Sequence, residues 1–383
     1  MCPVISIKYF RLLILVISIL FPQLVLSAPV QVALIAGFSA DNSNTATKMC
    51  RGADVFFSLH KEAVKHLSIQ HFDNSDSPKK AIDTARNVFD QGIKYIIGLP
   101  QSNDAIPISK FVSEKDMLFI SPLATNKTIT INNRRVFRIR YSDNYQSKVI
   151  AKYIHDELKA KKLLVLINVE STYSIGLADY LSIDLSDTKG YKVKIKKYYY
   201  DKVNIKYSEL TKIINRINPD VVFIPDYSSV ASLLIRHIHN LDKSIIFMGA
   251  DAWNRKEIFN GLNNVKSDIE LIHSTDWYKD LKNDTNKKYT ARFKKLFPAV
   301  EPDADSALTY DSLCILWSAL KIAKNKEDVD EIIEIIENNK FNVTSGLLSY
   351  HPNIDHDPKK NIYILKFDTV EDKELLLKKY ETF

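Results

Sequence analysis

The stretch YIIGLPQSNDAIPISKFVSEKDMLFISPLAT, residues 95–125, decides how this chain folds. It contains a short apolar strand at residues 95–97, a loop, a helix that begins near Ser102, and a second strand at residues 117–120. A polar loop, Ser121-Pro122-Leu123-Ala124-Thr125, follows the second strand. Because ligands bind beyond the carboxyl ends of the strands in an open parallel sheet, these loops predict half of a binding site.

The chemistry of these loops indicates what the half-site binds. The first turn of a helix offers backbone N–H groups that lack intrahelical partners, together with a partial positive charge. Both suit a carboxylate, and the neighbouring hydroxyls add donors. The stretch holds no nucleophile beside a general base, so it predicts the binding of a small anion or zwitterion and not catalysis.

Alternating strands and helices extend along the whole chain. Further strands are expected at residues 32–37, 67–72, 136–140, 163–167, 191–198, 221–224, 245–249, 269–275, 346–349 and 362–367. Further helices are expected at residues 45–65, 81–91, 144–159, 173–185, 207–217, 228–240, 286–297, 304–324 and 329–337. Strands that alternate with helices over short connections are typical of parallel sheets, and the pattern starts again after residue 135. We therefore expect an α/β protein with two doubly wound parallel-sheet lobes.

Length and composition agree with two folded domains. The chain has 383 residues, of which 45% are hydrophobic and 26% charged, enough for two cores. Its formal net charge is +7; residues 1–27 contribute Lys8 and Arg11 and no acid, which leaves +5 for the rest. A small charge spread along the chain, without a basic arm, gives no indication of nucleic-acid binding.

Residues 1–27 have the pattern of a signal peptide. Lys8 and Arg11 precede an apolar run at residues 12–21, and the segment ends in small residues at Ser27-Ala28. An uncleaved membrane anchor is the alternative, although Pro22 and Gln23 interrupt the run before a full span. We expect an exported protein, located in the periplasm or otherwise outside the cytoplasm.

The remaining reactive residues do not form a recognisable catalytic or metal site. Cys50 and Cys314 could pair in an oxidising compartment, but both lie in helical patterns, which favours buried free thiols. Residues 351–357 gather His and Asp side chains, either as a metal site or, as we favour, as a turn. No zinc-protease, P-loop, serine-hydrolase or CxxC motif occurs, so no catalytic residue, metal or cofactor is expected.

Several segments, in this order, match those of one family. They are FDNSDSP, GIKYIIG, the Gln101-Ser102-Asn103 loop, ISPLAT, VFRIRYSDNYQSKVIAKYI, KKLLVLINVESTYSIGLAD, IIFMGADAW, STDWY, PDADSALTYDSLCILWSALKIA and SGLLSY. From residue 32 to residue 367 the chain thus resembles the periplasmic-binding-protein type I fold, and within it the Leu/Ile/Val-binding group of ABC-transporter substrate-binding proteins. The resemblance implies a two-lobed clamp that closes on its ligand by hinge motion.

The resemblance also implies domain boundaries and site residues. It places lobe I at residues 29–141 plus 276–345, lobe II at 142–275 plus 346–383, and three hinge segments near 140–144, 274–277 and 345–350. It implies that Ser102, Ala124 and Thr125 hold a ligand carboxylate and that Asp251 receives its ammonium. Tyr173, Tyr227 with Ser228, and Phe38 or Ser39 would complete the pocket.

Alternatives remain for these residues. Thr125 could simply end a strand and cap a turn, Asp251 could cap a helix that begins near Trp253, and Tyr173 could pack at a helix start. The loops at residues 38–45, 99–103 and 173–176 depart from the branched-chain amino-acid binders, which leaves the ligand's side chain open.

The sequence therefore predicts a solute-binding protein that captures an amino acid or similar small zwitterion and presents it to a membrane permease of an ABC transporter. Its alternative is a binding-protein-like domain that acts as a sensor or as a periplasmic activator and contacts a protein partner. An enzyme would need a titratable pair in the cleft, for which the sequence offers only Asp251 and Asp226.

Overall fold

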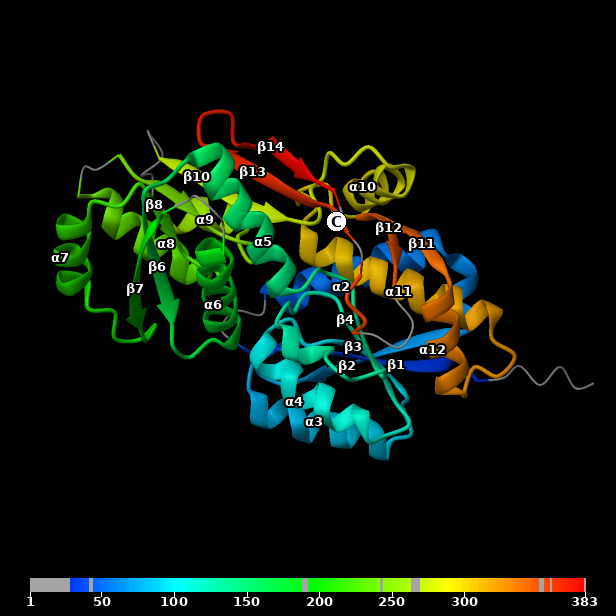
Figure 1. The fold of residues 1–383 in the computed structure, drawn as a ribbon. Helices are drawn as coiled ribbons and strands as arrows, with labels where there is room; N and C mark the ends of the chain where they lie inside the picture. Colours follow the sequence, from blue (N-terminus) through cyan, green and yellow to red (C-terminus); the bar gives the residue numbers. More distant parts are fainter. Residues whose placement is uncertain are drawn as a thin grey trace, which may run out of the picture.

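The computed structural model describes residues 28–40, 44–187, 192–241, 244–262, 269–350, 355–358 and 360–381. These residues form two α/β lobes that lie side by side (Figure 1). The predicted signal peptide at residues 1–27, and residues 351–354 of the possible metal cluster, lie outside the described residues. In the part of the chain that is described, no helix is long and apolar enough to cross a bilayer.

Lobe I is built on a parallel five-stranded sheet of order β2-β1-β3-β4-β5. Its strands are β1 (Val30–Ala36), β2 (Leu67–Asp73), β3 (Tyr95–Gly98), β4 (Leu118–Ser121) and β5 (Val136–Arg138). Its helices are α2 (Asn44–Leu59), α3 (Pro78–Asp90), α4 (Ser102–Ser113), α10 (Asp284–Leu296), α11 (Ala304–Ile322) and α12 (Val329–Asn338), with 3-10 turns at Lys61–Lys65 and Lys127–Ile129. A hairpin of β11 (Lys340–Val343) and β12 (Gly346–Ser349) packs beside α11.

Both faces of this sheet are covered by helices, which explains the continuous apolar strands. Successive β1 residues point to opposite faces. Val32 and Leu34 join the core that contains α2 and α11, whereas Ala33 and Ile35 join the core that contains α3 and α4. Strands buried on both faces are mostly apolar, as is usual in parallel sheets, and half-buried Gln31 is the polar residue of β1.

Lobe II contains a seven-stranded sheet of order β14-β13-β10-β9-β8-β6-β7. Its strands are β6 (Lys162–Asn168), β7 (Lys194–Tyr200), β8 (Val221–Phe223), β9 (Ile246–Met248), β10 (Glu270–Thr275), β13 (Ile362–Asp368) and β14 (Lys373–Tyr380). Its helices are α5 (Asp143–Tyr153) with a π turn at Ile154–Leu158, α6 (Thr172–Asp187), α7 (Tyr207–Ile217), α8 (Ser228–His239) and α9 (Arg255–Gly261). The pairs β10–β13 and β13–β14 are antiparallel, and the other pairs are parallel.

The chain passes between the two sheets after β5, after β10 and between β12 and β13, which brings three connections together beside the cleft. The predicted fold class is confirmed, whereas the detailed lobe boundaries stay a prediction. Leu348 of β12 packs in the core of lobe I, whereas the predicted boundary places residues 346–349 in lobe II.

Several elements differ from the sequence prediction. The helix expected at residues 45–65 ends at Leu59 and continues as a separate 3-10 turn. The strand expected at residues 191–198 is β7, which extends to Tyr200. The elements α9 and β11, which are short, and the longer strand β14 were not predicted.

The two cysteines of the described chain are free. The Sγ atom of Cys50 lies 3.7 Å from Nε2 of His71, and the Sγ atom of Cys314 lies 3.6 Å from Nε2 of His60. The disulfide that the sequence left open is therefore not formed, and the expectation of free thiols is confirmed.

Candidate functional site

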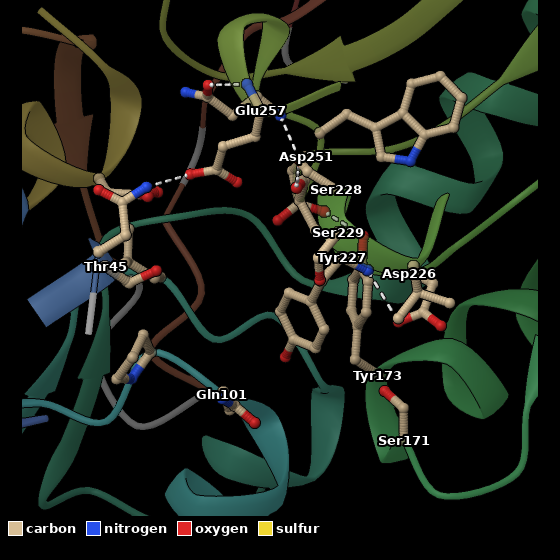
Figure 2. A pocket seen from close by; sticks show the side chains of 18 of the residues that line it. Thr45, Gln101, Ser171, Tyr173, Asp226, Tyr227, Ser228, Ser229, Asp251 and Glu257 are labelled. Carbon is tan, nitrogen blue, oxygen red and sulfur yellow. Dashed lines mark hydrogen bonds between the residues drawn. The ribbon is translucent and has the colours of Figure 1, made fainter. Parts of the chain in front are cut away.

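The carboxyl ends of strands from both sheets face a single cavity of about 610 Å³ between the lobes. Lobe I contributes the N-terminal part of α2 and the loops after β1, β3 and β4. Lobe II contributes the loops after β6, β7, β8 and β9. Figure 2 shows Thr45 and Gln101 on one side of the cavity and Tyr227 and Ser229 on the other.

Most of the predicted site residues line this cavity. They are Ser102, Ala124, Thr125, Tyr173, Tyr227, Ser228 and Asp251. Phe38 is not part of the lining: its ring packs edge-on against His71, with 5.4 Å between the ring centroids, and joins the core of lobe I. Ser39 instead donates to Asp73. Gly37 and the start of α2 line the cavity where Phe38 was expected.

The lobe I wall combines a helix N-terminus with the loop after β4. Helix α4 begins at Ser102, and its N-cap residue, Gln101, makes no side-chain cap. Ser102 Oγ accepts a hydrogen bond of 3.3 Å from the backbone N–H of Asn126, which ties the two loops together. Thr125 is buried, and its carbonyl oxygen accepts from the N–H of Asp143 at 2.9 Å. The first turn of α4, whose N–H groups lack intrahelical partners, thus lines the cavity together with Thr125.

The lobe II wall is organised around Asp251. Its Oδ1 accepts from Tyr173 Oη at 3.0 Å and from Gln146 Nε2 at 2.8 Å. Its Oδ2 accepts from Arg140 Nη1 at 2.5 Å, and the same nitrogen donates to the carbonyl oxygen of Asp251 at 3.0 Å. The side chains of Arg140 and Asp251 are only 3% and 4% exposed, so this is a buried ion pair. Asp251 does not cap α9, since Asn254 does so through a bond from Glu257 N.

A second buried ion pair continues from Arg140 into the connections between the lobes. Arg140 Nε lies 3.5 Å from Oδ1 of Asp276, and Lys360 Nζ lies 2.7 Å from Oδ2 of Asp276. Burial alone would lower the pKa of Arg140, but the carboxylates of Asp276 and Asp251 raise it above its ordinary value. Burial, reinforced by the charge of Asp251, raises the pKa of nearby Asp143 to about 8. The guanidinium is thus permanently charged, while Asp143 is largely protonated at neutral pH.

The loop after β8 supplies an aromatic wall and another helix N-terminus. The ring of Tyr227 lies 5.8 Å from that of Tyr173, centroid to centroid. Tyr227 is the N-cap of α8 and makes no side-chain cap. The preceding Asp226 accepts from Tyr227 N at 2.8 Å, from Asn168 Nδ2 at 3.0 Å and from Tyr200 Oη at 2.5 Å. Burial raises the pKa of Asp226.

Two sets of polar contacts join the lobes across the cavity. Glu257 of lobe II accepts from Asn44 Nδ2 at 2.7 Å and from Lys48 Nζ at 2.6 Å. Lys48 also contacts Asp305 at 3.2 Å. Burial alone would lower the pKa of Lys48, but Asp305, Asp303 and Glu257 raise it. The structure therefore represents a clamp with its lobes in contact.

The second set of contacts involves the loop before α6. Asn103 Nδ2 donates to the carbonyl oxygen of Glu170 at 2.7 Å, and Asn103 Oδ1 accepts from N and Oγ1 of Thr172 at 2.8 and 2.7 Å. Asn126 Nδ2 donates to the carbonyl oxygen of Thr172 at 2.9 Å. A Cβ on Gly176 would lie 3.0 Å from Asn126 Nδ2, so the glycine allows this close approach.

The arrangement suits binding. Each of the two carboxyl groups considered for an enzyme, Asp251 and Asp226, already accepts hydrogen bonds from several side chains of this protein. Within the described residues, no group of three or more His, Cys, Asp or Glu side chains could hold a metal ion. Asp357, from the cluster weighed as a metal site, instead pairs with Arg138 at 2.8 Å and Lys127 at 3.0 Å.

The sequence reasoning missed Arg140, Lys48, Asn103 and Glu257. Arg140 was assigned to a hinge segment, and nothing in the sequence connects it with Asp251, which is 111 residues away. The polar residues at the start of α2 and α4 could have been found, because both helices follow strands of the same parallel sheet and begin at its carboxyl edge.

Comparison with known proteins agrees with this architecture. Residues 29–373 match the family described as periplasmic binding protein. Leu/Ile/Val-binding protein homolog 3 of Brucella melitensis is 24% identical over 238 residues, which cover 60% of this chain and 63% of that relative, somewhat less than two thirds of its length. Leu/Ile/Val-binding protein BraC3 of Rhizobium johnstonii is 25% identical over 269 residues, covering 70% of this chain and 71% of the relative.

Solved structures share the fold. A leucine-binding protein LivK from Thermotoga maritima superposes with a TM-score of 0.83 at 21% identity, covering 92% of this chain and 99% of that chain. A solute-binding protein of an ABC transporter from R. palustris, in complex with benzoate, superposes with a TM-score of 0.80 at 16% identity. The match covers 93% of this chain and 97% of that chain. Because the family match extends over most of the sequence and the fold agrees, the chain belongs to the periplasmic binding protein family and has the type I fold.

Proposed function

We propose that this protein is the exported solute-binding component of an ABC-type importer. It captures a small polar solute in the cavity between its lobes and presents it to a membrane permease. The observation that carries the proposal is the cavity of about 610 Å³, which lies within the range of small-molecule sites and receives polar groups from both lobes. The family membership supports the transport role, because the relatives are binding proteins.

Capture would proceed by hinge closure. A solute that contacts Ser102 and Thr125 on one lobe and Tyr227 on the other is bound completely only when the lobes are together. The contacts from Lys48 to Glu257 and from Asn103 to Thr172 join the lobes in the closed form. In this proposal the protein catalyses nothing and needs no cofactor or metal, and residues 1–27 are removed on export.

The ligand predicted from the sequence is an amino acid or similar small zwitterion. Names of relatives support this class, and the benzoate complex of one structural neighbour supports acids more broadly. Amino acids and these other acids both carry a carboxylate. The N-termini of α4 and α8 and the hydroxyl of Thr125 are suitable donors for that group.

A thermal-shift screen of the mature chain from Ala28 tests the proposal. The compounds are amino acids, aliphatic and aromatic acids, amides, purines and urea-like solutes. A ligand at 100 times its Kd that binds only the folded protein stabilises it by about 2.7 kcal/mol, which produces a clear shift in Tm. The shift should shrink in Thr125→Ala and persist in Ser113→Ala, an exposed hydroxyl at the far end of α4. A screen without any hit on well-folded protein would contradict solute capture and favour a sensor or activator that contacts a protein partner.

A further inference from the structure

The ion pair between Arg140 and Asp251 bears directly on which solutes the cavity accepts. A carboxylate that receives a ligand's ammonium group contributes its negative charge to that contact. Here the charge is already matched inside the protein, because Arg140 Nη1 lies 2.5 Å from Oδ2 of Asp251. Oδ1 of Asp251 is also occupied, by the hydroxyl of Tyr173 and the side-chain amide of Gln146.

The buried groups next to Arg140 add no spare negative charge, whereas Asp226, on the far side of Tyr227, is held by the neutral donors Asn168 and Tyr200. Lys360 matches Asp276, the next carboxylate beyond Arg140, at 2.7 Å. Asp143 lies behind the loop of Thr125, fully buried, and burial raises its pKa to about 8, so it is mostly neutral at pH 7. A ligand ammonium placed beside Asp251 would be an additional cation in a set of charges that is already balanced. Burying an uncompensated charge is costly, and the nearby guanidinium would repel it.

The same end of the cavity is rich in donors for an anion. Helices α4 and α8 enter from opposite lobes, each has at least twelve residues, and neither N-cap residue occupies the first turn with its side chain. Ser102, Thr125 and Ser229 place hydroxyls beside these N-termini. Arg140 itself lines the cavity. These groups favour the carboxylate of a ligand, and their contacts with it do not require an ammonium group on the same ligand.

We infer that Arg140 determines specificity: by neutralising Asp251 it adapts the cavity to carboxylic acids without an ammonium group and disfavours free α-amino acids. The inference rests on the proposed function and narrows its ligand class. The rings of Tyr173 and Tyr227, 5.8 Å apart, and the volume of about 610 Å³ leave room for an acid with a body of aromatic size.

Matched pairs of compounds test this directly by calorimetry. Each pair differs only in the ammonium group: 3-phenylpropanoate against phenylalanine, 4-methylpentanoate against leucine, and, for the tightest hit of the screen, its own aminated or deaminated counterpart. We expect the acid to bind at least tenfold more tightly than its amino acid. Tighter binding of the amino acid, or a tightest hit that is not a carboxylate, would overturn the inference while leaving solute capture intact. Absence of any ligand contradicts both.

Two substitutions distinguish a cavity that prefers acids from a cavity that prefers amino acids. Asp251→Asn keeps the shape of the side chain and leaves the Arg140 charge uncompensated, so the affinity for the acid should increase. If Asp251 bound an ammonium, the same change would abolish binding. Arg140→Gln frees the Asp251 charge and should shift the preference towards the ammonium-bearing partner by at least tenfold.

Asp83→Asn, an exposed change on α3, serves as the charge control and should alter neither affinity. Circular dichroism and melting curves check that each variant folds. If Arg140→Gln does not fold, the affinity of Asp251→Asn for the acid decides alone. An unchanged or lower affinity for the acid in Asp251→Asn would contradict the assigned role of Arg140.

Discussion

Asn103 joins the two lobes through three hydrogen bonds across the cleft. The Nδ2 atom of Asn103 donates to the backbone carbonyl oxygen of Glu170. Its Oδ1 atom accepts from the N–H and the hydroxyl of Thr172, and the three distances are 2.7 to 2.8 Å. Asn103→Ala removes all three bonds. Because the side chain is half-exposed at the rim and belongs to neither core, the change should act on closure and not on folding.

The size of the effect follows from the net worth of a hydrogen bond. Each bond contributes about 0.5–1.5 kcal/mol, and bonds near solvent lie at the lower end of this range. Three such bonds correspond to about 1.5 kcal/mol, which is roughly a tenfold change in an equilibrium constant. A ligand that binds the closed form should therefore have a Kd about tenfold higher in Asn103→Ala, mainly through faster dissociation.

Calorimetry with the tightest ligand of the screen measures this Kd, and stopped-flow fluorescence measures the dissociation rate. Asn87→Ala, an exposed asparagine on α3 within lobe I, is the matched control and should bind as the parent does. The Tm of Asn103→Ala without ligand should be unchanged. If the Kd of this variant stays within twofold of the parent, the contacts between Asn103 and Thr172 do not stabilise the closed form, and the reasoning is refuted.

The pKa of Asp143 is about 8 in the folded protein and lower in the unfolded chain, so the stability of the parent falls as the pH rises from about 4 to about 8. Asp143→Asn does not ionise, so the Tm of this variant relative to that of the parent should increase steadily over the same range. A constant difference would contradict this. Gly176→Ala should weaken ligand binding without lowering the Tm of free protein, because its Cβ would lie 3.0 Å from Asn126 Nδ2 of lobe I; unchanged affinity would contradict it. Arg138→Ala, which loses a fully buried guanidinium bonded to Asp357, should destabilise by about 3–5 kcal/mol in denaturant unfolding, and a loss below 1 kcal/mol would contradict a buried ion pair.

The sequence was sufficient for the fold where local patterns coincide with burial. Strands β1, β3 and β4 are continuous apolar runs bounded by polar loops, and both of their faces are covered. Strand β14, with the sequence KELLLKKY, was missed because most of its side chains are half-buried or exposed. Its pairing with β13 determines its conformation, and such pairing leaves no apolar periodicity in the strand itself.

Within the site, too, local sequence patterns predict some residues, and contacts that form only on folding determine others. Ser102, Ala124 and Thr125 could be predicted, because each lies a few residues after a strand whose carboxyl end must lie at the edge of the parallel sheet. The charge state of the opposite wall could not, because it depends on Arg140 and Asp251, which come together only after both lobes fold. Phe38 also directly follows a strand, yet its ring packs against His71 and away from the cavity.

The central claim, that one solute binds between the lobes, is tested most directly by isothermal titration calorimetry of the tightest ligand with the parent and the double variant Ser102→Ala/Thr125→Ala. Both side chains line the cavity from lobe I. We predict one ligand per chain for the parent and at least a hundredfold loss of affinity in the double variant, with its native fold confirmed by circular dichroism. Binding of unchanged affinity in the double variant, or a stoichiometry other than one, would contradict the claim.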